Sequence, residues 1–307
     1  MKLFKEETEC ITVSEEEFAK KLNLETVYCK NKGIKLCSIS VNRPGMILTG
    51  YEKLFAGSRV QVMGKAEIQY LNSLEASTRK EIVQNFFSKK FPCLVVARGQ
   101  KIPSEIISSA KKYKIPLFRT IKVTAVFIND VFIYLNELLA PSTTMHGILL
   151  DVFGIGVLIT GRSGIGKSEA ALELVHRGHR LVSDDIVEIK DINGKLFGYS
   201  PPVTEHLMEI RGLGLINVKS MYGVGAVLNS IAIELVIELR DWSAEETYNR
   251  IGEKESYEEI LGLTLNKKII PIIAGRNIAV LMEVAVSDHR LKQGGYNTLD
   301  DLNKRMS

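Results

Sequence analysis

Two kinds of hydrophobic pattern alternate along the first 130 residues. Short apolar runs predict strands, and they occupy residues 36–41, 46–49, 59–63 and 93–97. Between these runs, apolar residues recur at helical spacing over residues 14–22, 67–73, 77–89 and 104–113. Strands and helices in alternation are typical of an α/β layer structure. We therefore expect an α/β domain over residues 1–130.

An apolar-rich stretch over residues 127–140 predicts a helix that Pro141 stops, and we place a domain boundary near residue 130. The second domain then spans residues 131–307. Its strands are expected at residues 148–153, 156–160, 181–190, 231–240, 269–273 and 278–286. Its helices are expected at residues 167–178, 244–250, 255–262 and in the charged C-terminal end.

Composition narrows the class of protein. The chain has 307 residues, of which 45% are hydrophobic and 25% charged, and this balance excludes a disordered chain, a collagen-like repeat and a coiled coil. Residues 1–130 carry 22 Lys and Arg against 13 Asp and Glu, whereas residues 131–307 carry 18 against 23. The positive excess of the first half is spread without a dense run, so we expect no nucleic-acid partner.

The sequence shows no targeting signal, so we expect a cytoplasmic protein. No window holds eighteen consecutive apolar residues, and the first residues lack the apolar region of a signal peptide, so we expect no membrane partner. In that compartment cysteines are expected to be buried small hydrophobic residues rather than disulfides or zinc ligands. The chain has four, Cys10, Cys29, Cys37 and Cys93.

The clearest chemical motif is a glycine-rich loop. It fits G-x-x-x-x-G-K-[ST] at every fixed position and consists of Gly161, Arg162, Ser163, Gly164, Ile165, Gly166, Lys167 and Ser168. An apolar run at 156–160 enters the loop, and a strong helix former at 169–177 leaves it. Glycines let backbone N–H groups converge on phosphate oxygens, Lys167 can reach the β- and γ-phosphates, and the Ser168 hydroxyl can ligate magnesium. The sequence predicts nucleotide phosphate binding here, against the alternative of a chance match in a turn.

Candidate carboxylates follow the loop in two places. Asp184 and Asp185 are flanked by apolar residues, so one could hold the metal while the other takes a proton from an attacking hydroxyl; the alternative is a solvated turn. Glu209 and Arg211 would share one face of an extended segment. There Glu209 could ligate magnesium and Arg211 could meet phosphate charge, against the alternative of a surface salt bridge before a strand.

Three further positions are candidates for charge or proton chemistry. His146 precedes the first strand of the second domain, although a lone histidine is more often structural than catalytic. A second glycine-arginine loop at residues 271–277 could bring Arg276 to an anion. Arg250 is another candidate cation.

Together these motifs resemble the bacterial HPr kinase/phosphorylase family, and the resemblance covers nearly the whole chain. The segments that carry it are NRPGMILTGY at 42–51, APSTTMHG at 140–147, GRSGIGKSE at 161–169, HRLVSDD at 179–185, EIRGLGLINV at 209–218 and PxxxGRN at 271–277. The resemblance implies an enzyme that acts on one serine of HPr, the phosphocarrier protein of the sugar phosphotransferase system, and that regulates carbon metabolism.

The resemblance also implies a fold, cosubstrates and an assembly. The N-terminal domain would be similar to the uridine-nucleotide-binding domain of Mur ligases. The C-terminal domain would be a P-loop kinase domain related to phosphoenolpyruvate carboxykinase. The family uses ATP or pyrophosphate with Mg²⁺ to phosphorylate HPr, and removes that phosphate by phosphorolysis with inorganic phosphate, releasing pyrophosphate. Its members form homohexamers.

Roles carry over to matching positions. Asp185 resembles the family's reversible acid/base, and residues 209–218 resemble a signature involved in both reactions. The remaining matches are Lys167, His146 and Arg250 as active-site residues, Ser168 and Glu209 as magnesium ligands, and Pro271, Gly275 and Arg276 in a loop tied to dephosphorylation.

The second glycine-arginine loop, residues 271–277 and called the late loop below, departs from the family pattern. Ile273 and Ala274 stand where Arg and Pro are common. Loss of a cation there would weaken phosphate binding while leaving the kinase reaction intact. We therefore expect a lower ratio of phosphorolysis to kinase activity than in relatives that keep the arginine.

Two other classes of protein fit the phosphate loop. A carboxykinase would need a longer chain and a Lys/His/Asp manganese site that the sequence does not assemble, and a small-molecule kinase would label a metabolite instead of HPr. A nucleotide-dependent sensor or assembly ATPase would release free phosphate alone. Incubation with radiolabelled ATP and HPr separates these classes.

Overall fold

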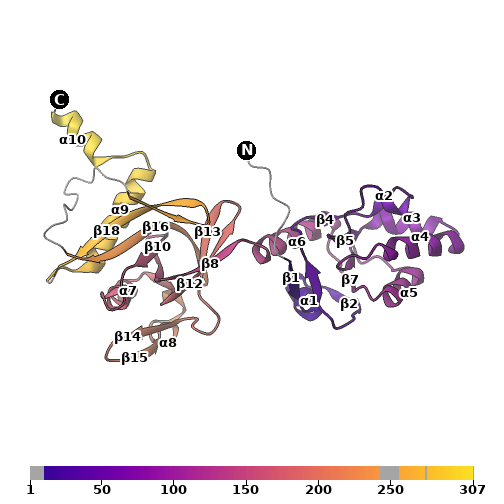
Figure 1. The fold of residues 1–307 in the computed structure, drawn as a ribbon, viewed down its shortest axis with the longest axis horizontal. Helices are drawn as coiled ribbons and strands as arrows, with labels where there is room; N and C mark the ends of the chain where they lie inside the picture. Colours follow the sequence, from indigo (N-terminus) through magenta and orange to yellow (C-terminus); the bar gives the residue numbers. More distant parts are fainter. Residues whose placement is uncertain (1–9, 243–255, 274, 307) are drawn as a thin grey trace. The chain divides into compact units, whose positions relative to one another are not determined.

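A computed structural model describes residues 10–242, 256–273 and 275–306 of the chain (Figure 1). The chain divides into two compact units, Met1–Ala140 and Pro141–Ser307. The division lies at 140/141 rather than near 130 because helix α6 (Thr124–Leu138) belongs wholly to the first unit. Its apolar face packs in the core of that unit.

The first unit holds a five-stranded sheet in the order β2-β7-β6-β5-β4, in which β4 to β7 run parallel and β2 is antiparallel. Its strands are β2 (Glu25–Tyr28), β4 (Val41–Asn42), β5 (Val60–Met63), β6 (Leu94–Val96) and β7 (Leu117–Arg119), with β1 (Ile11–Val13) and β3 (Ile34–Leu36) as a separate pair. Its other helices are α1 (Glu15–Leu22), α2 (Gly45–Leu48), α3 (Lys65–Ser73), α4 (Ala76–Ser88) and α5 (Ser104–Tyr113).

Two apolar clusters cover the two faces of this sheet. Strand side chains alternate between faces, so Val95 joins one cluster while its neighbours Leu94 and Val96 join the other. Helices α1 and α6 bury their apolar residues in the first cluster, and α3, α4 and α5 bury theirs in the second. The expected α/β layer structure is confirmed for this unit.

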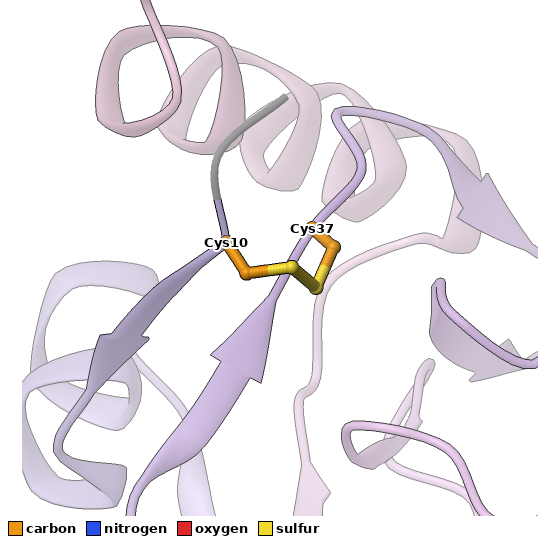
Figure 2. The surroundings of a disulfide bond; sticks show 2 residues. All are labelled: Cys10 and Cys37. Atoms are coloured by element: carbon orange, nitrogen blue, oxygen red, sulfur yellow. A yellow bond between two sulfur atoms is a disulfide. The ribbon is translucent and has the colours of Figure 1, made fainter. Parts of the chain in front are cut away.

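A disulfide corrects the expectation for two of the four cysteines. Strands β1 and β3 are antiparallel, with Ile11 opposite Leu36, and this register brings Cys10 opposite Cys37 just beyond the strand ends. The two are joined, as Figure 2 shows. Cys93 is buried as expected, and Cys29 is partly exposed. The pairing across the strands was not visible in the sequence because the cysteines lie 27 positions apart.

The second unit is built on a nine-stranded sheet. Its main path runs β11-β9-β10-β16-β13-β12-β8, and β18 extends it from β16 with β17 outside. Its strands are β8 (Ser142–His146), β9 (Ile148–Val152), β10 (Ile155–Thr160), β11 (Arg180–Ser183), β12 (Ile186–Ile192), β13 (Lys195–Tyr199), β16 (Ser230–Asp241), β17 (Ser256–Ile260) and β18 (Leu263–Ile272). A separate hairpin pairs β14 (Leu207–Ile210) with β15 (Gly214–Asn217). The helices are α7 (Lys167–His176), α8 (Val218–Tyr222), α9 (Ile278–Gln293) and α10 (Thr298–Met306), with a 3₁₀ turn, η1 (Val224–Ala226).

Three parallel strands of this sheet end at one edge. Strand β16 lies between β10 and β18 and is parallel to both (Figure 1). The phosphate loop follows β10, and the late glycine-arginine loop follows β18. Ligands of open α/β sheets bind beyond the carboxyl ends of parallel strands, so this edge is where a site is expected.

Five predicted elements differ from the structure. Residues 36–41, expected as one strand, hold only the end of β3 and the start of β4, and residues 37–40 form no strand. Residues 278–286, expected as a strand, form helix α9, and residues 256–260, expected as a helix, form β17. Residues 45–48 form the short helix α2 rather than a strand. The strand expected at 181–190 is broken into β11 and β12 at Asp184 and Asp185. The helix expected at 244–250 lies outside the described residues.

Two helices of the second unit follow the prediction, whereas the short helix α8 was not predicted. Helix α7 begins and ends within two residues of the expected 167–178, and the charged C-terminal end forms α10. Across the ranges that the structure describes, no helix has both the length and the hydropathy needed to cross a bilayer.

Candidate phosphate-binding and catalytic site

The phosphate loop connects β10 to α7 with backbone conformations that glycine permits. Gly161 has φ +140°, and a Cβ there would lie 2.5 Å from the carbonyl oxygen of Leu239 on the neighbouring strand. Gly166 has φ +99° and is the N-cap of α7. The side chain of loop residue Ile165 is buried in the hydrophobic core of the unit, and this packing anchors the loop. The N-terminus of α7 therefore opens onto the loop, as an anion site requires.

Lys167 lies along the loop that precedes it. Its Nζ donates to the carbonyl oxygens of Gly161 at 2.8 Å and Arg162 at 3.1 Å. These contacts hold the ammonium group at the loop, where phosphate oxygens would bind. Lys167 also lines the cleft described below.

Arg162 pairs with Asp241 at the end of β16. Its Nη2 donates to Asp241 Oδ1 at 2.7 Å, and its Nε donates to Oδ2. The guanidinium beside Asp241 lowers the pKa of that carboxyl. The pair joins the phosphate loop to the strand next to β10, across 79 positions of sequence, and it was not expected from the sequence.

Asp184 is the buried carboxylate of the site. It is 6% exposed, its Oδ2 accepts from the backbone N–H of Glu209 at 2.9 Å, and its Oδ1 lies 3.5 Å from Ser168 Oγ. Burial raises the pKa of Asp184 above its usual range, the N–H of Glu209 partly offsets that rise, and the charge of Asp185 adds to it. The ionised group is thus short of positive charge in the free protein.

Asp185 is placed differently although it is adjacent. It has φ +66° at the break between β11 and β12, and its side chain is 79% exposed. Its Oδ1 lies 3.6 Å from Nδ1 of His146, which is the last residue of β8 and is also exposed. The backbone holds this arrangement because Gly147 N–H donates to the Asp185 carbonyl at 2.9 Å. Asp185 therefore presents an accessible carboxylate beside an imidazole.

The hairpin β14–β15 supplies one wall of the site. Buried Met208 and Ile210 alternate with exposed Glu209 and Arg211, so the latter two share a face as the sequence predicts. The Arg211 guanidinium lies against the loop, since a Cβ on Gly164 would be 2.7 Å from its Nη1. The hairpin thus brings one carboxylate and one cation to the phosphate loop.

These groups meet in one cleft of about 160 Å³. Its lining residues are Ile148, Ser163, Gly164, Gly166, Lys167, Ser168, Glu169, Asp184, Asp185, Glu209 and Arg211. Ser168, Asp184 and Glu209 are among the lining residues with side-chain oxygen atoms, which are the ligands of a hard cation such as Mg²⁺. The buried, uncompensated charge of Asp184 also fits a bound cation. The residues present therefore fit magnesium.

The late loop lies at the same sheet edge but is not among the described residues that line the cleft. Pro271 belongs to β18, opposite Arg240 of β16, and Gly275 has φ +84°. The Arg276 N–H donates to the Ile273 carbonyl at 3.2 Å, which forms a turn before α9. Of the other predicted residues, Arg250 lies outside the described residues, as does Ala274.

Comparison with known proteins matches both units. Residues 2–135 match the family described as "HPr Serine kinase N terminus", and residues 137–306 match "HPr Serine kinase C-terminal domain". The chain is 47% identical over 296 residues to the "HPr kinase/phosphorylase" of Caldanaerobacter subterraneus subsp. tengcongensis, which covers 96% of this chain and 97% of that protein. The protein of the same name from Clostridium perfringens is 42% identical over 295 residues, covering 96% of both chains.

A solved structure is also similar to part of the chain. The Hpr(Ser) kinase/phosphatase from Coxiella burnetii is 37% identical with a TM-score of 0.48, and the match covers 52% of this chain and 98% of that chain.

Proposed function

Because this chain belongs to the HPr kinase/phosphorylase family, we propose that it phosphorylates one serine of the phosphocarrier protein HPr with ATP and reverses that reaction by phosphorolysis. The chain is an enzyme, a kinase/phosphorylase. The observation that carries the proposal is a single cleft in which the phosphate loop, the buried Asp184 and the exposed Asp185 meet.

In the kinase direction the loop binds the phosphates and Asp185 acts on the nucleophile. The backbone N–H groups of the loop and Lys167 would hold the β- and γ-phosphates. The exposed carboxylate of Asp185 would take the proton of the seryl hydroxyl as its oxygen attacks the γ-phosphorus. His146, 3.6 Å away, would orient that carboxylate, and Arg211 would neutralise phosphate charge.

Magnesium would be held by Ser168, Asp184 and Glu209. When bound, it supplies positive charge that neutralises the phosphates during transfer. Asp184, whose pKa burial raises, would then have a positive charge beside its carboxylate. Its hydrogen bond from Glu209 N–H holds the β14 strand to the metal side of the cleft.

The reverse reaction uses the same groups. An oxygen of inorganic phosphate attacks the phosphorus of phosphoserine, the new P–O bond forms as the bond to the serine oxygen breaks, and pyrophosphate leaves. Asp185 returns the proton to the serine oxygen. One carboxylate suffices because the two directions share a single proton transfer. Pyrophosphate as an alternative phosphoryl donor follows from the same chemistry.

The family resemblance supports further parts of the proposal. The unit 141–307 would be the catalytic domain, related to phosphoenolpyruvate carboxykinase, and unit 1–140 would be similar to the uridine-nucleotide-binding domain of Mur ligases. The enzyme would act as a cytoplasmic homohexamer that regulates carbon metabolism. Arg250 and the late loop with Pro271, Gly275 and Arg276 would complete the active site.

The test is a paired assay of Asp185→Asn and wild type. We expect the amide to lose both ATP-dependent phosphorylation of HPr and phosphate-dependent release of pyrophosphate, by roughly 100-fold or more, with nucleotide binding retained. Glu188→Gln on β12 is the matched control, since Glu188 does not line the cleft, and both its activities should persist. If Asp185→Asn keeps either activity, the shared acid/base is another residue.

A further inference from the structure

Asn277 makes two hydrogen bonds with opposite ends of one side-chain amide. Its Oδ1 accepts from the N–H of Val280 at 3.0 Å and so caps the N-terminus of α9. Its Nδ2 donates to Glu173 Oε1 at 2.7 Å. Glu173 lies on α7, the helix that begins in the phosphate loop. One residue therefore joins the start of α9 to the phosphate-loop helix.

The receiving carboxylate is itself fixed. Arg177, the C-cap residue of α7, donates to Glu173 Oε1 from Nη2 at 2.8 Å, and its Nη1 lies 3.3 Å from Glu283 on α9. The Asn277 hydrogen bond, followed by that of Arg177, lowers the pKa of Glu173. The acceptor is therefore ionised at neutral pH and held by its own helix.

The hydrogen bond between Asn277 and Glu173, called the tie below, restrains the late loop because Asn277 lies at the end of that loop. Arg276 is its direct neighbour, and the loop runs only from the end of β18 at Ile272 to the start of α9. That loop and the phosphate loop leave the same edge of the sheet, with β16 between their strands. Fixing Asn277 to α7 thus sets the position of the Arg276 backbone relative to the phosphate loop.

We propose that Asn277 is a positioning residue: through its hydrogen bond to Glu173 it fixes the position of the late loop, which contains Arg276, relative to helix α7. This position would determine the KM of the enzyme for inorganic phosphate. The inference rests on the proposed phosphorolysis activity. It assigns to Asn277 no contact with substrate.

Two single variants break the tie from its two sides. Asn277→Asp keeps the cap on α9, because Asp caps helices as well as Asn, but replaces the donor with a carboxylate facing Glu173. Glu173→Ala removes the acceptor and leaves the cap untouched. The combination of Asn277→Asp with Glu173→Gln restores a hydrogen bond with its polarity reversed. Glu283→Gln is the matched control, since it perturbs the same α7–α9 contact without touching Asn277.

We expect both single variants to raise the KM for inorganic phosphate roughly threefold to tenfold, the effect of one net hydrogen bond, with kcat for HPr phosphorylation unchanged. The Arg276 amide, which donates to Ile273, should exchange its hydrogen faster in both. The double variant should recover both properties, and Glu283→Gln should alter neither.

Three results overturn the proposal. One is an unchanged phosphate KM and unchanged Arg276 exchange in both single variants. Another is an equal effect of Glu283→Gln, which would mean general loosening between the helices. The third is failure of the double variant to recover. If wild type itself phosphorylates no HPr or forms no pyrophosphate, the proposed function fails, and the exchange measurement still tests the positioning.

Discussion

Asp184 shows how a functional carboxylate can cost the free protein stability. Its pKa is raised in the fold by burial, so the ionised form is less favourable there than in the unfolded chain. A raised pKa contributes stability below the unfolded value, and that contribution is lost as pH rises through the folded value. At neutral pH the ionised carboxylate therefore destabilises the fold, and a bound cation would offset that destabilisation.

Asp184→Asn should stabilise the enzyme while inactivating it. We expect the melting temperature near neutral pH to rise roughly 2–4 °C, the shift that about 1 kcal/mol produces in a domain of this size, because an amide carries no charge to desolvate. The Asn oxygen can still accept from Glu209 N–H. The gain should shrink as pH falls and Asp184 becomes protonated. Thermal melts from pH 4 to 8, with the paired kinase assay, measure both effects.

Asp191→Asn is the control for that series, since Asp191 is a carboxylate of the same unit that accepts from a turn N–H at Gly194 outside the cleft. A melting temperature of Asp184→Asn that is lower than wild type at pH 8 would contradict the argument. So would a stabilised variant that retains magnesium-dependent kinase activity.

At the scale of elements, the sequence predicted most strands and helices but misassigned residues 278–286 and 256–260. Residues 278–286 are almost entirely apolar and rich in Ile and Val, which suits a buried strand. However, Asn277 caps a helix whose buried residues Ala279, Met282 and Val286 follow helical spacing. Residues 256–260 were expected as a helix, but the left-handed turn at Leu261 and Gly262 pairs them with β18. In both cases a cap or turn residue next to the segment, rather than the hydrophobic pattern within it, decided between helix and strand.

The residues of the candidate site were predictable from the sequence, but the contacts that orient them were not. The loop, Asp184, Asp185, Glu209 and Arg211 were predictable because each lies in a local motif with its own chemistry. The contacts that orient the motifs were not, because they join distant positions: 79 apart for Arg162 with Asp241 and 104 apart for Asn277 with Glu173. Only the parallel arrangement of β10, β16 and β18 brings them together.

The connection between β18 and α9 carries a prediction about the balance of the two reactions. Ile273 lies in the turn that Arg276 closes, where the family pattern commonly has an arginine. Ile273→Arg should raise the ratio of phosphorolysis to kinase activity roughly threefold or more, since an added cation attracts phosphate. Initial rates of pyrophosphate release and HPr phosphorylation give the ratio.

Val280→Arg adds the same charge at an exposed site on the first turn of α9 and is the control for Ile273→Arg. It should leave the ratio as in wild type. An unchanged ratio in Ile273→Arg, or an equal rise in Val280→Arg, would show that the missing arginine does not limit phosphorolysis.

At the scale of the whole molecule, charge is divided between the units. Residues 1–140 hold 22 Lys and Arg against 14 Asp and Glu, and residues 141–307 hold 18 against 22. The first unit has a net positive field that can steer an acidic partner, with an effect that salt screens. We therefore expect the first unit to contribute to partner association without placing a residue in the cleft.

Steering predicts a salt-dependent effect of a single charge reversal. Lys111→Glu, at an exposed position of α5, should lower kcat/KM for HPr roughly twofold at low ionic strength and have no effect at high ionic strength. Lys195→Glu, an exposed reversal in the second unit, should not reproduce this salt dependence. Equal effects of both variants, or a salt-independent loss in Lys111→Glu, would refute steering by the first unit.

The Cys10–Cys37 disulfide makes the stability of the first unit depend on redox conditions. All four cysteines belong to residues 1–140, so only that unit can exchange electrons with thiols around it. Closing a ring across 27 positions stabilises a fold by roughly 3–4 kcal/mol when the bond is intact. The unfolding free energy of the first unit is thereby tied to the ambient reduction potential. Residues 141–307 contain no cysteine, so no thiol or disulfide links the stability of that unit to oxidising or reducing surroundings.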